Sequence, residues 1–314
     1  MVNMARQSIV ILLIISTFVS IALTSCGEYQ AILKTRDNDL WYRKGLEYFD
    51  KGEFARSANL LGPLVTAYAG TSRSDTVTLY YARSLAELGD YSTAAYYFQQ
   101  YVKTYPGGEQ CENCQYMAAY CYYMLSPKVE LDQADTETAI TEMQTYLNMY
   151  PNSSRVSEIE AMMREMQDKL ALKEFNSAVL YYRLGNYMGN NYRSAVIVAQ
   201  NCLKRYPDTK HREDLSFLIL ESKYIQAERS VLSKQGDRYR DAIDEYYAFV
   251  NEFPQSKYSR RADKILKDSR EGLEAVEKLI PPSADDMDYY RNYGSQLDKE
   301  VEAAREAAEN AKNN

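Results

Sequence analysis

The sequence predicts an all-α fold, a solenoid of about five helical hairpins, and three observations support this prediction. A Tyr-x-x-Ala pattern, followed by Pro twelve residues after the Ala, recurs along the chain. Its small residues lie 37 to 56 residues apart, which is the period range of helical-hairpin repeats. Turns of Gly, an acidic residue and an aromatic residue precede the first two copies. The copies are Tyr91, Ala94 and Pro106; Thr136, Ala139 and Pro151; Tyr192, Ala195 and Pro207; Tyr239, Ala242 and Pro254; and a degenerate first copy of Phe54, Ser57 and Ala69-Gly70.

Each position of this pattern has a physical reason. Gly supplies the backbone angles that a helix end requires, and Pro ends the hairpin because it cannot continue a helix. The aromatic residue packs back between the two helices, and the small residue lets them approach closely. Trp41, Gly45 and Tyr48 also match tetratricopeptide positions in spacing. The expected architecture is therefore a right-handed α-solenoid of about five tetratricopeptide-like helical hairpins.

The helices that the pattern predicts alternate with short turns along the chain. They cover about 39–51, 54–69, 76–88, 91–105, 114–125, 136–150, 155–184, 192–206, 214–232, 239–253 and 258–279. The expected organisation is a lipoprotein signal peptide over 1–25, a lipid-anchored tether over 26–38, repeats one to three over 39–151, repeats four and five with a capping helix over 152–282, and a charged helical or disordered tail over 283–314.

The start of the chain resembles a bacterial lipoprotein signal. An apolar run from Ile9 to Leu23 is too short for a spanning helix, which needs about 20 apolar residues, and is typical of a signal-peptide core. It ends in Leu23-Thr24-Ser25-Cys26-Gly27, in which small residues precede a lone cysteine. We expect cleavage before Cys26 and a covalent lipid on its sulfur. The alternative is a transmembrane anchor with an incidental cysteine.

The residues after Cys26 indicate the membrane. In the proteobacterial sorting scheme an Asp at the next position would retain the lipoprotein at the inner membrane, whereas Gly27 resembles the outer-membrane case. No acidic run follows directly, so the sequence shows no signal for export to the cell surface. We expect a lipid-anchored protein on the periplasmic face of the outer membrane.

Composition argues for a binding protein. The net charge of −7 becomes −8 once Arg6 leaves with the signal, which argues against nucleic acid as a partner because phosphate binding needs clustered Lys and Arg. Tyrosine is in large excess, at 30 residues against 8 Phe and 1 Trp. Neither a Gly-rich phosphate loop nor H-E-x-x-H is present, and a Ser/His/Asp arrangement would depend on the single His211. We therefore expect no enzymatic activity and no cofactor besides the lipid.

The remaining cysteines offer one chemical alternative. Cys111 and Cys114 form a C-x-x-C motif, with Cys121 close by and Cys202 in repeat four. The motif lacks the strand-then-helix context of a thioredoxin site, and it lacks the three or four ligands that a metal site usually needs. We expect a local disulfide or two unpaired thiols and no metal. A thiol-disulfide enzyme is the less favoured reading.

A concave groove lined by the first helix of each repeat is the expected working surface. Tyrosine suits such a surface, because it offers a large apolar face and one hydrogen-bonding group. Any single tyrosine at helical spacing could instead be a packing residue. The candidates are Tyr42, Leu46 and Phe49 from repeat one, Leu79 and Arg83 from repeat two, and Tyr116, Tyr120 and Tyr123 from repeat three.

From repeat three onward the chain resembles the BamD family, the tetratricopeptide lipoproteins of the outer-membrane β-barrel assembly machine. The resemblance covers roughly residues 26–270 and rests on an ordered set of motifs. They are YPNS at 150–153, a long helix with Asp168, Leu170, Ala171 and Glu174, then Tyr181-Tyr182 and YPDT at 206–209. The sequence departs from the pattern at Met188 to Asn191 and beyond about residue 283.

The resemblance implies a non-enzymatic adaptor in the assembly and insertion of β-barrel outer-membrane proteins. It implies that the C-terminal repeats bind a BamA-like β-barrel protein through its POTRA domains, and that the N-terminal repeats contact unfolded outer-membrane proteins. The departure from the pattern at Met188 to Asn191 falls in repeat four, one of the repeats to which the resemblance assigns the first contact. The alternative is a tetratricopeptide lipoprotein scaffold of another envelope machine, in secretion or cell-wall coordination.

Overall fold

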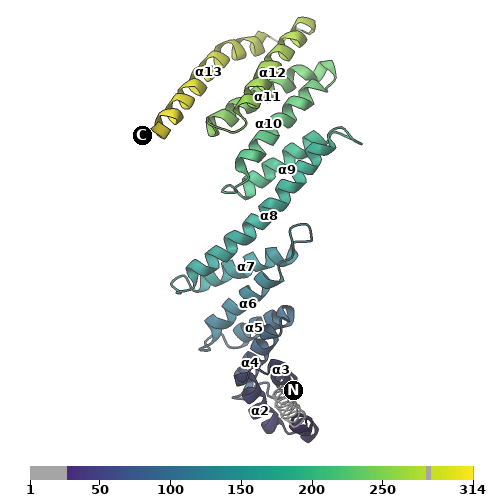
Figure 1. The fold of residues 1–314 in the computed structure, drawn as a ribbon, viewed down its shortest axis with the longest axis vertical. Helices are drawn as coiled ribbons and strands as arrows, with labels where there is room; N and C mark the ends of the chain where they lie inside the picture. Colours follow the sequence, from purple (N-terminus) through teal and green to yellow (C-terminus); the bar gives the residue numbers. More distant parts are fainter. Residues whose placement is uncertain (1–26, 281–283, 314) are drawn as a thin grey trace, which may run out of the picture. The chain divides into compact units, whose positions relative to one another are not determined.

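The computed structural model describes residues 27–280 and 284–313, and this part of the chain is helical without a strand. The predicted signal peptide and Cys26 lie outside the described residues. The helices are α2 (Asn38–Asp50), α3 (Phe54–Ala67), α4 (Ser74–Glu87), α5 (Tyr91–Thr104), α6 (Cys111–Leu125), α7 (Ala134–Met149), α8 (Val156–Leu184), α9 (Asn191–Arg205), α10 (Arg212–Glu228), α11 (Leu232–Glu252), α12 (Ser259–Leu279) and α13 (Ala284–Asn313) (Figure 1).

Five pairs of helices form the predicted hairpins, which confirms the fold class. The pairs are α2 with α3, α4 with α5, α6 with α7, α8 with α9, and α10 with α11. The chain divides into two compact units, with unit 1 ending at Met166 and unit 2 beginning at Gln167 inside α8. Each unit has cores of its own, shared between successive helices.

The small residue of each repeat lies in the core, between packed helices. Ser57, Ala94, Ala139, Ala195 and Ala242 are all fully buried, with no exposed surface. Gly52 and Gly89, at the two expected turns, adopt φ angles of 74° and 79°, which favour glycine over residues with a side chain. The sequence pattern therefore identified a core residue in every repeat.

Helix boundaries differ from the expected ranges by a few residues at several places. Asp37 caps α2, because its carboxylate accepts hydrogen bonds from the backbone N–H of Asp39 and Leu40, so the helix begins at Asn38. The polar stretch 233–237, expected as a turn, lies within α11. The preceding helix ends earlier than expected, at Glu228, so the connection is shorter and begins at Arg229.

The segments that flank the five hairpins among the described residues pack against them. Residues 27–35, expected as a polar tether, are helical, and Tyr29 and Ile32 are buried against Tyr48 and Leu60. Their spacing of three residues places both on one face of that helix. The tail forms α13, whose Val301 is buried in the same core as α11 and α12.

Two glycines in helices of unit 2 provide a matched test of packing. A β-carbon at Gly272 would lie 2.5 Å from Cζ of Tyr239, whereas one at Gly236 would have its nearest neighbour at 3.8 Å. Alanine is favoured over glycine inside a helix by about 1 kcal/mol, and overpacking costs about 1–3 kcal/mol. We expect Gly272→Ala to lower the melting temperature and Gly236→Ala to raise it, measured by circular dichroism. Equal shifts in the two variants would contradict this packing.

Candidate interaction surfaces

The three candidate tyrosines of repeat three form a row along α6. Tyr116 and Tyr120 stack with ring centroids 6.2 Å apart, and Tyr120 and Tyr123 stack at 6.3 Å. Positions i, i+4 and i+7 lie on one helix face, so the spacing itself brings the rings together. The structure therefore places these three residues on one surface of unit 1, as the sequence predicted.

The tyrosine row also packs against the beginning of α8. The hydroxyl of Tyr116 donates to Glu158 at 2.8 Å, and that of Tyr123 donates to Glu165 at 2.7 Å. Burial, reinforced by the hydrogen bond to Glu158, raises the pKa of Tyr116 to about 12. The Arg155 guanidinium lies 4.2 Å from the centroid of the Tyr116 ring. The outer two tyrosines thus join α6 to α8, and Tyr120 lies between them half-buried.

The candidates from repeats one and two are divided between core and surface. Leu79 is 6% exposed and belongs to the core between α4, α5 and α6, so its side chain is a packing residue. Tyr42 and Leu46 are half-buried against Leu61 and Leu64 of α3. The remaining two candidates, Phe49 and Arg83, are also half-buried. Phe49 meets Tyr80 edge to face at 4.9 Å, and the Arg83 side chain donates to Gln110 at 3.1 Å.

The cysteines lie inside the protein as free thiols. Cys111, Cys114, Cys121 and Cys202 are all buried. Burial raises the pKa of Cys114 and of Cys121 to about 12, and that of Cys202 to about 11. Because the thiolate is the reactive form, these thiols are poor nucleophiles at neutral pH. This environment argues against the thiol-disulfide alternative.

His211 has a packing role. Its ring stacks on Phe175 with centroids 4.5 Å apart, and burial, followed by the charge of Lys210, lowers its pKa. No group of His, Cys, Asp and Glu suited to hold a metal ion occurs among the residues that the structure describes. None of the described helices has the length and hydrophobicity needed to cross a bilayer.

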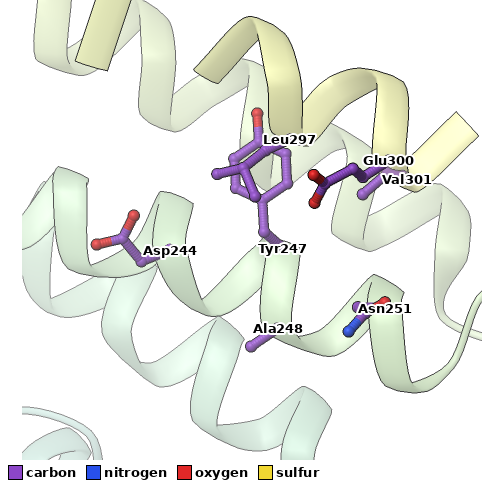
Figure 2. A pocket seen from close by; sticks show the side chains of 7 residues that line it. All are labelled: Asp244, Tyr247, Ala248, Asn251, Leu297, Glu300 and Val301. Carbon is purple, nitrogen blue, oxygen red and sulfur yellow. The ribbon is translucent and has the colours of Figure 1, made fainter. Parts of the chain in front are cut away.

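The C-terminal helix covers one side of unit 2. Asp298 accepts a hydrogen bond from Tyr247 at 2.8 Å and pairs with Arg270 at 2.8 Å, while Arg305 pairs with Asp263 at 2.7 Å. Burial raises the pKa of Tyr247 to about 12. A cavity of about 340 Å³ lies between α11 and α13 (Figure 2). It is lined by Asp244, Tyr247, Ala248, Asn251, Leu297, Glu300 and Val301.

The sequence analysis did not predict a serine–glutamate hydrogen bond that recurs in both units and that we call the latch. After the repeat's Pro, a serine reaches back to a glutamate at the start of the preceding first helix. Ser153 donates to Glu112 at 2.6 Å in unit 1, and Ser256 donates to Glu213 at 2.6 Å in unit 2. The shared Pro-x-Ser spacing after the two repeats was a signal that could have identified it. The latch fixes the loops between successive hairpins.

Comparisons with known proteins point to one family. A family model described as YfiO, outer membrane lipoprotein, matches residues 34–190 and 184–292. The outer membrane protein assembly factor BamD of Caulobacter vibrioides is 22% identical over 193 residues, which cover 61% of this chain and 61% of that protein. The chain thus spans about three fifths of that relative's length. BamD of Rickettsia prowazekii is 21% identical over 226 residues, which cover 72% of this chain and 84% of that protein.

Solved structures give weaker similarity. The tetratricopeptide domain of P58(IPK) aligns with a TM-score of 0.36 and 16% identity, covering 78% of this chain and 68% of that one. The fold assignment rests on the hairpins described above.

The burial of the thiols can be tested by alkylation. At pH 8 a thiol with a pKa of about 12 is a thiolate in roughly one molecule in ten thousand. We expect Cys114, Cys121 and Cys202 to resist iodoacetamide in the folded protein and to react fully in denaturant, as read by mass spectrometry. Rapid modification of Cys114 in the folded protein would reopen the thiol-disulfide reading.

Proposed function

This chain belongs to the YfiO family of outer membrane lipoproteins, and from that membership we propose that it acts in the assembly of outer membrane β-barrel proteins. In this role it is a non-enzymatic adaptor, anchored by a lipid on Cys26 at the periplasmic face of the outer membrane. The observation that carries the proposal is the family match, which spans both units and all five hairpins. Two relatives named as outer membrane protein assembly factors support it.

The architecture is compatible with an adaptor. Stacked helical hairpins give each segment contacts mainly with its neighbours, so different parts of the chain can hold different partners. All eight groove candidates lie in unit 1, and the tyrosine row is half-buried rather than fully buried. We propose that unit 1 contacts unfolded outer-membrane proteins and that unit 2 binds a BamA-like β-barrel protein through its POTRA domains.

Co-purification tests the assembly role. The tagged full-length chain, extracted from membranes in detergent, should bring down a β-barrel protein with POTRA domains, identified by mass spectrometry. Untagged membranes treated in parallel provide the control. Recovery of only secretion or cell-wall proteins would favour the alternative scaffold role and overturn this one.

The client surface calls for a variant that spares the α6–α8 hydrogen bonds. Tyr116 and Tyr123 make those bonds, so Tyr120 is the residue to change. Truncating a hot-spot tyrosine costs about 2 kcal/mol, so Tyr120→Ser should reduce crosslinking to unfolded barrel segments by about tenfold or more. Tyr96→Ser, at an exposed tyrosine on α5, should leave crosslinking unchanged.

Two outcomes would contradict this assignment. If Tyr120→Ser crosslinks as well as the parent while folded by circular dichroism, the tyrosine row is a packing element alone. If both variants lose crosslinking equally, clients bind through exposed tyrosines without a defined surface. Co-purification of the β-barrel partner should persist in both variants.

A further inference from the structure

Two neighbouring turns form one edge of unit 2, which we call the turn edge and define as residues 183–193 and 228–238. The first segment joins α8 to α9, and the second joins α10 to α11. The side-chain amide of Asn190 donates to Gln226 at 3.5 Å, and the Arg229 guanidinium lies 5.7 Å from the centroid of the Tyr192 ring. Both turns project on the same side of the unit (Figure 1).

The turn edge exposes large apolar side chains. Met188 is 90% exposed, Tyr187 is 68% exposed and Val231 is 67% exposed, with Leu184 and Leu232 exposed beside them. Soluble proteins rarely leave adjacent apolar residues this open unless they contact a partner or a membrane. The first turn also contains Met188 to Asn191, the insertion by which the chain departs from the BamD pattern. These exposed side chains therefore require a contact that explains them.

The first turn holds its apolar tip in a defined and unfavourable backbone conformation. Met188 has a φ angle of 54°, which is uncommon for a residue with a side chain, and Gly185 and Gly189 flank it with positive φ. Asn191 closes the turn, since its backbone N–H donates to the carbonyl of Gly185 at 2.9 Å and its side chain donates to that of Tyr187 at 2.7 Å. The fold thus accepts strain in order to present Tyr187 and Met188 to the outside.

The charge of the turn edge is opposite to that of the chain. The edge contains five Lys or Arg residues and two acidic residues, in a protein whose net charge is −7. The basic side chains are Arg183, Arg193, Arg229, Lys234 and Arg238, of which the first four are exposed. A projecting apolar tip surrounded by basic side chains fits the interface of an anionic bilayer, where apolar groups enter the headgroup region and Lys and Arg meet lipid phosphates.

We propose that the turn edge docks on an anionic lipid surface, with Tyr187, Met188, Val231 and Leu232 in the headgroup region and the flanking arginines on lipid phosphates. The contact is separate from the lipid on Cys26 and does not depend on the assembly role. It holds unit 2 against the membrane at a fixed edge. A protein partner is the competing occupant, and the experiment below separates the two.

The test reads membrane depth at single positions in the full-length, lipid-anchored protein. Met188→Cys and, separately, Leu232→Cys are labelled with an environment-sensitive nitrobenzoxadiazole dye, which the buried native thiols should not take up. The matched control is Leu131→Cys. Leu131 is 57% exposed, and residues 127–135 around it carry one basic and three acidic side chains. Circular dichroism confirms that each labelled variant is folded.

The proteins are reconstituted in phosphatidylcholine vesicles with phosphatidylglycerol and with nitroxide-bearing acyl chains. We expect the dyes at 188 and 232 to shift to the blue and to lose most of their emission, and the dye at 131 to do neither. Quenching at 188 should fall when phosphatidylglycerol is omitted or salt is raised, because salt screens exposed charges.

Three results would overturn the proposal. Emission typical of an aqueous environment at 188 and 232, in vesicles that contain no other protein, would show that the turn edge does not bind lipid and would favour a protein partner. Equal quenching at 131 and 188 would show that the anchored protein contacts the membrane without a preferred edge. Undiminished quenching in neutral vesicles would show that the arginines do not contribute to the contact and that anionic lipid is not required.

Discussion

The close packing of neighbouring helices around one small residue in each repeat is the constraint on which the rest of this structure depends. In each repeat this residue has no exposed surface, so a neighbouring helix lies directly against it. In the first repeat the residue is Ser57 of α3, and its hydroxyl meets that of Ser84 on α4, the first helix of the next hairpin, at 3.0 Å, which satisfies a polar group that burial would otherwise penalise. This packing sets the position of the other parts of the repeat. They are the aromatic turn residue, the serine that follows the proline, and the first helix of the next repeat.

The same geometry explains why the chain uses tyrosine where many cores use phenylalanine. Successive hairpins meet across half-buried interfaces, where an apolar ring and a polar tip are both needed. In each unit tyrosine hydroxyls reach carboxylates on a neighbouring helix. The pairs are Tyr116 with Glu158, Tyr123 with Glu165, Tyr182 with Glu221, Tyr246 with Asp263 and Tyr247 with Asp298. Phenylalanine would remove the hydroxyl donor from each of these carboxylates. The tyrosine excess is therefore first a feature of packing, and any binding surface is built on what that packing leaves open.

The sequence predicted the features that recur locally and missed those that join distant segments. The period, the buried small residues and the proline ends follow from spacing alone, and the structure confirms the hairpins they define. The row of Tyr116, Tyr120 and Tyr123 also follows from helical spacing. Leu79 shows the limit, because helical spacing gives the face of a residue but not the neighbour that covers it. The pairing of Arg305 with Asp263, 42 positions apart, leaves no periodic signal at all.

The two ends of the chain complete this argument. A terminal hairpin has a neighbour on one side only, so its other apolar face needs a cap. At the start, the helix over 27–35 covers Tyr48 and Leu60 with Tyr29 and Ile32. At the end, α13 covers the face of α11 that carries Tyr246 and Tyr247. Both capping segments are polar in composition and lack the spacing of the repeats. For this reason the sequence predicted a tether and a tail at these places. Because the chain itself covers these two faces, the sides of the hairpins and their turns are the surfaces left open.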